Sequence, residues 1–167
     1  IQAAGFNVLN VVDSWIDPPT LNQLAGFAPW DLILWPFQTM REIEVIAPSR
    51  ALPAPEKLPP EWIEQLKILK PKYLVPSSCQ FQQESWSWYN QAFFPVSYRQ
   101  FQQEIESEIS KVQVVRLNPS RSFILGKNSL KMSSALPWIQ PVGEQDVDYQ
   151  YLKDLKPPMT AEIARHF

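Results

Sequence analysis

The sequence predicts an α/β fold, with a mixed β-sheet flanked by helices, because short apolar runs alternate along it with helical patterns. The apolar runs are rich in Val, Leu and Ile and are bounded by Pro or polar residues, as buried strands are. We expect four strands, at residues 6–12, 31–37, 72–75 and 112–117. Strands that alternate with helices are typical of parallel pairs joined by crossover helices.

Three helices are expected between these strands, over residues 20–27, 61–69 and 98–110. The last has the clearest pattern, because its apolar side chains recur at spacings of three and four, which place them on one face of a helix. They are Tyr98, Phe101, Ile105 and Ile109. Ser97 and Gln100 form a capping-box pattern at its start. Gly26 is expected to end the first helix.

The rest of the chain carries less pattern. Proline is abundant at 17 residues, and we expect the Pro-rich segment 48–60 to be a surface loop, because proline fixes φ and lacks an N–H donor. Residues 123–128 are interpreted as a strand and a turn, and 146–167 as an interrupted helical segment. Residues 1–167 are expected to form a single domain. Both ends read as cut, which indicates a fragment or a processed product.

Composition excludes several classes of function. The formal net charge is -2, whereas a protein that binds nucleic acid through phosphate contacts normally has a basic excess. No apolar run reaches the roughly 18–20 residues that a membrane-spanning helix needs. The single cysteine, Cys79, excludes an intrachain disulfide and suits a reducing compartment, so we expect a cytoplasmic protein. The only histidine, His166, lies one place from the end, so the chain has no histidine-based catalytic or metal site of its own.

Polar residues follow each predicted strand, where open α/β sheets bind their ligands. Solvated loops also begin with polar residues, so a single cluster fits either interpretation. The clusters are Asp13, Ser14 and Trp15; Gln38 and Thr39; Ser77, Ser78, Cys79 and Gln80; and residues 118–121. From them we take as candidate substrate-binding residues Trp15, Gln38, Ser77, Ser78 and Cys79.

Asp13 is the strongest candidate for chemistry. A carboxylate directly after a buried strand suits a metal ligand, a general base or the N-cap of the next helix. The N-cap interpretation holds equally for Asp17, four residues later. We take Asp13 as the candidate catalytic and metal-binding residue.

Nucleophilic catalysis has weaker support. As a nucleophile Cys79 needs a nearby base, and the only histidine, His166, is distant in the sequence. A buried cysteine is usually an inert apolar residue. Ser77 and Ser78 lack a G-x-S-x-G elbow and are interpreted as hydrogen-bonding loop residues. The aromatic run at 81–94 suits an apolar pocket or a partner surface, although a cover for the sheet edge is the favoured interpretation.

Three segments together resemble the C-terminal half of metallo-β-lactamase-fold proteins, in the branch of lactonase-like and sugar-nucleotide-hydroxylase-like members. They are VLNVVDSWID at 8–17, WDLILWPFQ at 30–38 and LKPKYLVPSSCQF at 69–81. The resemblance covers about residues 5 to 125 and implies half of an αββα sandwich. It also implies that Asp13 corresponds to the metal-bridging aspartate of the family.

The same resemblance implies a metal-dependent hydrolase with a divalent metal, zinc first and iron or manganese next. The family's final metal-binding histidine is absent near Ser78, and its H-x-H-x-D-H motif, which belongs to the N-terminal half, is not in this chain. The implied partners are therefore that N-terminal half and a small-molecule substrate. The alternative is a non-catalytic interaction or scaffold domain that keeps the fold without a complete metal site.

Overall fold

The structure is a computed structural model, and it describes residues 1–37, 41–47, 52–53, 55–78 and 96–139. Gln38, Cys79, His166, the aromatic run 81–94 and the segment 146–167 lie outside these ranges. The strands are β1 Gln2–Ala3, β2 Phe6–Asn10, β3 Leu32–Pro36, β4 Tyr73–Ser77, β5 Gln113–Val114, β6 Phe123–Gly126 and β7 Ser129–Met132. The helices are α1 Pro18–Ala25, α2 Glu42–Ile46, α3 Pro60–Leu69 and α5 Tyr98–Glu108.

Five strands form one mixed sheet in the order β1-β2-β3-β4-β5. The strands β2, β3, β4 and β5 are parallel neighbours in chain order, and β1 joins the edge by an antiparallel pairing with β2. The predicted α/β class and mixed sheet are therefore confirmed. All four predicted strands are present, although β2 and β5 end earlier than the apolar runs do.

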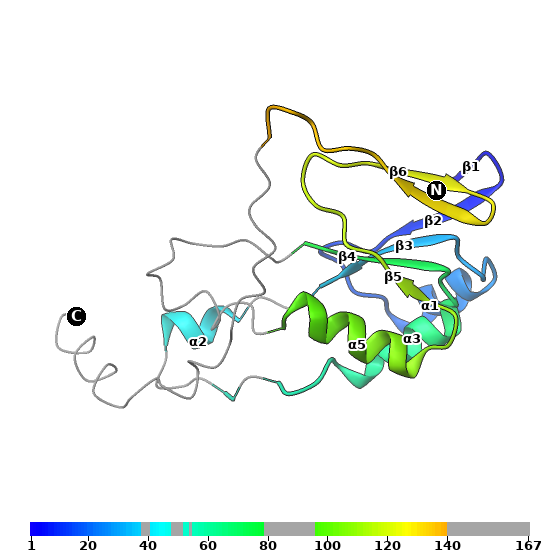
Figure 1. Cartoon of the computed structure of the whole chain (residues 1–167). Helices are drawn as coiled ribbons and strands as arrows, with labels where there is room; N and C mark the ends of the chain where they lie inside the picture. Colours follow the sequence, from blue (N-terminus) through cyan, green and yellow to red (C-terminus); the bar gives the residue numbers. More distant parts are fainter. Residues whose placement is uncertain (38–40, 48–51, 54, 79–95, 140–167) are drawn as a thin grey trace.

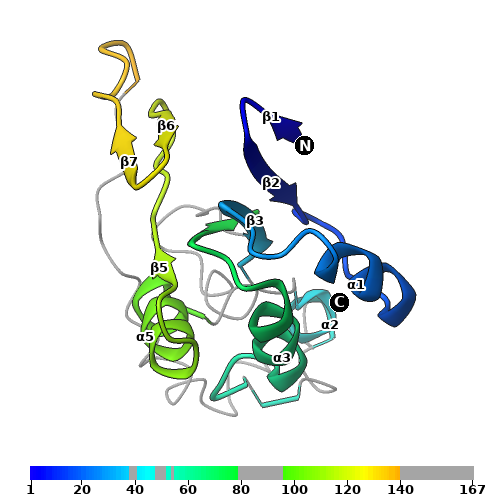
Figure 2. The same ribbon diagram turned by 90° about the vertical axis from the view of Figure 1, so that its right-hand side faces the viewer.

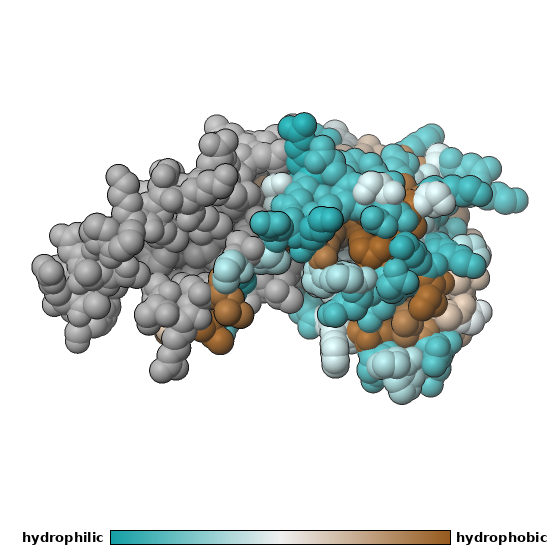
Figure 3. Space-filling model, turned by 90° about the horizontal axis from the view of Figure 1, so that it is seen from below, coloured by the Kyte–Doolittle hydropathy of each residue, from teal (hydrophilic) through white to brown (hydrophobic). Residues whose placement is uncertain are grey.

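One face of the sheet is covered by α1, α3 and α5, which lie together below it in Figures 1 and 2. Right-handed crossovers between parallel strands in sequential order place every connecting helix on the same side. Alternate residues of β3 and the residue after it, namely Ile33, Trp35 and Phe37, are buried on this face. They pack with apolar residues of α3 and α5: Leu66, Leu69, Phe101 and Ile105. The outer surface of this layer is mostly hydrophilic, with apolar residues between the polar ones (Figure 3).

The other face of the sheet is partly covered by the antiparallel hairpin of β6 and β7 (Figure 2). Leu32, Tyr73 and Val75 form a small core there, against which Phe123 and Leu125 of β6 pack. The predicted strand and turn at 123–128 is thus confirmed, with β7 as its partner. Since both faces carry apolar contacts, the parallel strands read as continuous apolar runs in the sequence.

A side chain caps the start of α5, whereas no side-chain hydrogen bond caps the start of α3. Ser97 accepts a hydrogen bond from the Gln100 amide at 3.0 Å, as the capping box predicts. The Gln100 side chain does not return to Ser97 but donates to Glu104 and to the Glu56 carbonyl, so only half of the box forms. Gly26 ends α1 as predicted, but in a right-handed conformation rather than the left-handed one that favours glycine. Pro60 is the first residue of α3, a position that the fixed φ of proline suits.

The described part of the Pro-rich segment is irregular up to Pro59, as predicted, and α3 begins at Pro60. The Pro-rich segment is held against α5, because the Leu58 amide donates to the Glu104 carboxylate at 2.7 Å and Leu58 is buried. Sequence analysis missed β1, α2 and β7, which have two, five and four residues. Within the described ranges, no helix has the length and apolar character needed to cross a membrane.

We expect the Ile105→Val substitution to lower the free energy of unfolding by about 0.5–1.5 kcal/mol, because it removes one methylene from a fully buried position. The matched substitution Ile124→Val, at a side chain that is 65% exposed, should change it by less than about 0.5 kcal/mol. Urea unfolding followed by circular dichroism measures both. Equal effects of the two substitutions would contradict the position of α5 in the core.

Candidate functional site

The carboxyl ends of three parallel strands meet at one edge of the sheet. The Val11 amide donates to the Leu34 carbonyl at 2.9 Å, and the Phe37 amide donates to the Ser77 carbonyl at 3.1 Å. Because the register pairs Pro36 with Ser77, the residues after β2, β3 and β4 leave the sheet side by side. We call this the carboxyl edge: residues 11–15, Pro36, Phe37, Ser77 and Ser78. Such an edge is the usual ligand-binding side of an open α/β sheet.

Asp13 lies in the turn that follows β2, with its side chain exposed. The Ser14 amide closes the turn by donating to the Val11 carbonyl, and the Val12 amide donates to the Asn10 side chain. Asp13 has a φ of 58°, a left-handed conformation that aspartate tolerates better than most residues do. The structure thus places the predicted carboxylate at the carboxyl edge.

Asp17, not Asp13, is the N-cap of α1. Its side chain accepts a hydrogen bond from the Thr20 amide at 2.7 Å. The hydrogen bonds from Thr20 also lower the pKa of the Asp17 carboxyl from its usual value, because they stabilise the charged form. The sequence left open whether Asp13 or Asp17 caps the helix, and the structure gives this role to Asp17.

Ser77, the last residue of β4, and Ser78, which follows it, lie at the same edge. The Ser77 hydroxyl donates to the Val75 carbonyl at 3.2 Å. Ser78 has a φ of 68°, and its buried hydroxyl has no hydrogen-bond partner among the described residues. A buried hydroxyl without a partner is unusual and often marks a functional or strained position. Trp15 lies on the β2 side of the edge and is 83% exposed. The candidates Gln38 and Cys79 lie outside the described residues, so their roles stay predictions.

Sequence analysis missed two residues near the edge, Tyr98 and Arg116. Tyr98 begins α5, and its ring contacts Phe37 with 6.2 Å between ring centroids. The Arg116 guanidinium lies 5.3 Å from the centroid of the Tyr98 ring. Burial raises the pKa of Tyr98 well above its usual value, although the Arg116 charge opposes this. The helical spacing of Tyr98 indicated only a core position, and no sequence signal linked it to Arg116.

A metal centre needs more ligands than this edge supplies. Within the ranges that the structure describes, no group of three or more His, Cys, Asp and Glu side chains is arranged to hold a metal ion. Zinc sites usually take three or four protein ligands. Asp13 therefore fits one ligand of such a centre, and the described residues do not fit a complete one.

Comparison of the chain with protein-family models, with curated proteins and with solved structures finds no match. The fold and the carboxyl edge therefore carry the functional interpretation, together with the sequence resemblance as a prediction.

The Asp17→Ala substitution should make the chain less stable at pH 7, because the Thr20 amide loses its acceptor. The folded-state pKa of Asp17 is lowered below the usual 3.8, so its contribution is complete above that value and is lost as the pH falls through the lower folded pKa. The difference in urea midpoint between the unaltered chain and the variant should therefore shrink in acid. Asp17→Asn keeps an acceptor oxygen and is the control, with a smaller loss at pH 7. If Asp17→Ala lowered the urea midpoint by the same amount at neutral and at acid pH, the capping role of the charged Asp17 carboxylate would be contradicted.

Proposed function

We propose that this chain is part of a metal-dependent hydrolase of the metallo-β-lactamase fold, in which Asp13 supplies one oxygen ligand to a divalent metal. Zinc is the first choice of metal, and iron or manganese are the next. The remaining ligands come from outside the described residues, chiefly from an N-terminal half of the same fold. The bound metal would supply a water molecule acidified toward neutral pH.

The position of Asp13 is the observation that carries this proposal. Asp13 is exposed at the carboxyl edge, in the turn that directly follows β2. A hard oxygen donor in this place suits a divalent metal shared with another part of the protein. The sequence resemblance implies the same role for this residue.

Substrate contacts in this proposal come from the loops around Asp13. Ser77 and Ser78 lie at the carboxyl end of β4, at the same edge, and the Ser78 hydroxyl has no hydrogen-bond partner among the described residues. Trp15 adds an exposed aromatic surface two residues after Asp13. Gln38 and Cys79 complete the proposed contacts for a small-molecule substrate.

Substoichiometric Mn²⁺ tests the metal role of Asp13, since a bound paramagnetic ion broadens NMR signals only near its site. With the 167-residue chain, we expect broadening of the amide signals of Val12, Ser14 and Phe37. A single carboxylate binds Mn²⁺ weakly, but rapid exchange of the ion between protein molecules broadens the signals of all of them. The variant Asp13→Asn should abolish this broadening.

The matched control is Asp17→Asn, which removes a carboxylate four residues away and should leave the broadening unchanged. Broadening that persists in Asp13→Asn, or that centres on the acidic residues of α5, would contradict the assignment of Asp13. A complex with the N-terminal half that retains no zinc, iron or manganese would favour the non-catalytic interaction domain instead.

A further inference from the structure

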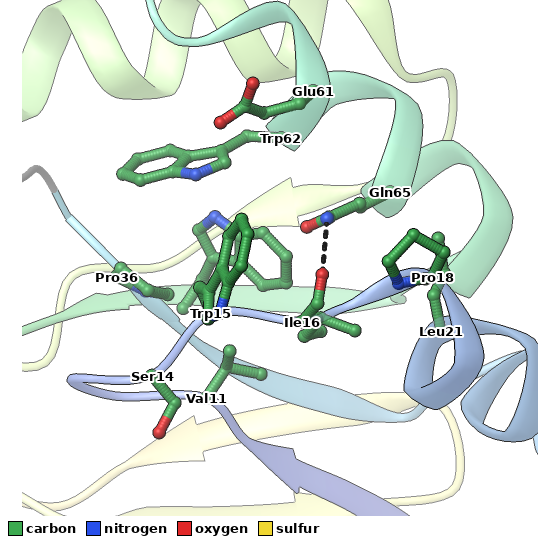
Figure 4. A pocket seen from close by; sticks show the side chains of 11 residues that line it. Val11, Ser14, Trp15, Ile16, Pro18, Leu21, Pro36, Glu61, Trp62 and Gln65 are labelled. Atoms are coloured by element: carbon green, nitrogen blue, oxygen red, sulfur yellow. Dashed lines mark hydrogen bonds between the residues drawn. The ribbon is translucent and has the colours of Figure 1, made fainter.

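An open pocket lies beside the carboxyl edge, on the helical side of the sheet. It has a volume of about 240 Å³ and is formed between the loop after β2, the end of β3 and the first turns of α3 (Figure 4). This volume is smaller than the roughly 300–1,000 Å³ of pockets that enclose drug-sized ligands. The pocket therefore suits a compact group, with the rest of its molecule left in solvent.

Two tryptophan rings from distant parts of the sequence form walls of this pocket. Trp15, in the loop after β2, is 83% exposed, and Figure 4 shows its ring projecting from that loop toward α3. Trp62 of α3 is half-buried and packs against the buried Trp35, with ring centroids 6.2 Å apart and an interplanar angle of 86°. The face of an indole ring is negative and is the best aromatic surface for a cation. The aromatic walls therefore favour a positively charged group.

The loop and the helix that carry these two rings are fixed to each other. The Gln65 side-chain amide of α3 donates to the Ile16 carbonyl at 3.1 Å, drawn as the dashed line in Figure 4. The Ile16 side chain is buried, which anchors the loop on the other side of this contact. The backbones of the two walls are thus in place before a ligand binds, which lowers the entropy cost of binding.

The charge of the lining is negative. Glu61 is the only charged residue among the described residues that line the pocket, and Figure 4 shows its carboxylate beside the Trp62 ring. Within the described part of the chain, no ion pair or hydrogen bond engages this carboxylate, whereas Glu64 on the same helix pairs with Lys67 at 3.1 Å. The Glu61 charge is therefore not neutralised by a described neighbour, and it attracts a cation to the pocket.

The rest of the lining decides which kind of cation fits. Apart from Glu61, only Ser14 and Gln65 bring polar side chains, and the other lining residues are aliphatic, proline or tryptophan. A primary ammonium has three N–H donors, and each one that loses water without finding an acceptor is costly. A quaternary ammonium has no N–H group, and its methyl groups pack on apolar surfaces and on aromatic faces.

We propose that this pocket binds the quaternary ammonium head of a small organic cation. Its methyl groups lie against the rings of Trp15 and Trp62, and Glu61 balances its charge. This site needs no metal and does not depend on the role proposed for Asp13.

Three compounds of similar shape and different charge test the proposal. Choline is the cation, 3,3-dimethylbutan-1-ol is its neutral carbon isostere, and 3,3-dimethylbutanoate is an anion with the same tert-butyl group. Each is titrated into the 167-residue chain at constant ionic strength, and the indole N–H signals are followed by ¹H–¹⁵N NMR. Choline should cause saturable shifts of the Trp15 and Trp62 signals. It should bind at least about tenfold more tightly than the other two compounds and than ethanolamine, which has a primary ammonium.

Trp15→Leu should weaken choline binding by at least about tenfold, because an aliphatic side chain replaces the aromatic face. It should leave the affinity for 3,3-dimethylbutan-1-ol nearly unchanged, so the preference for the cation is lost. Trp138→Leu is the matched control, because Trp138 is 75% exposed and does not line the pocket, and it should change neither affinity. EDTA should leave the choline shifts unchanged, which separates this site from any metal at Asp13.

Glu61→Gln should weaken choline binding by about three- to tenfold at low salt and by less at high salt, since salt screens a charge at an open pocket. Glu64→Gln is the matched control on the same helix, with a side chain that is 70% exposed and outside the pocket, and it should have no effect. Absence of saturable shifts with choline, or equal affinities for choline and its neutral isostere, would overturn the proposal. Equal effects of Trp15→Leu and Trp138→Leu, or of Glu61→Gln and Glu64→Gln, would overturn it as well.

Discussion

The position of β3 between β2 and β4 is the constraint on which the rest of this structure depends. Both neighbours pair with β3 in parallel, so its backbone groups are bonded on two sides while its side chains are buried in both cores. The burial of Ile33 and Trp35 against α3 fixes which face carries the helices. A register slip of one residue would turn these side chains to the other face, so the register is strongly specified.

That register also determines which loops come together. Because the three strands run in the same direction, Asp13 and the two serines at the carboxyl end of β4 lie at the same edge, though 64 positions separate Asp13 from Ser77. Asp13 and Ser78 both turn away from the sheet in a left-handed conformation. Residues held in such conformations persist where the surrounding structure fixes them and are frequent at functional sites. On the helical side, the same edge brings Trp15 and Trp62 to Trp35, which forms the pocket.

Much of this fold was predictable, because the parallel strands are buried on both faces and so appear as apolar runs. The helix α5 was predictable for a related reason, since Phe101 and Ile105 face the core at helical spacing. By contrast, β1 is too short to leave a periodic pattern, and its place is set by pairing with β2. The rule that ligands bind at strand carboxyl ends predicted the edge, but not the pairing of Tyr98 with Arg116. The pocket was not predictable, because residues 15, 35 and 62 meet only through the tertiary fold.

Amide hydrogen exchange at the carboxyl edge tests the central structural claim most directly. The Val11 and Phe37 amides donate across neighbouring strands to Leu34 and Ser77, so they should be protected nearly as strongly as the amides inside β3. Such protection would place the ends of β2, β3 and β4 side by side in solution. Exchange of both amides at the rate of an unstructured peptide, while the interior of β3 stays protected, would contradict the edge on which the proposed site is built.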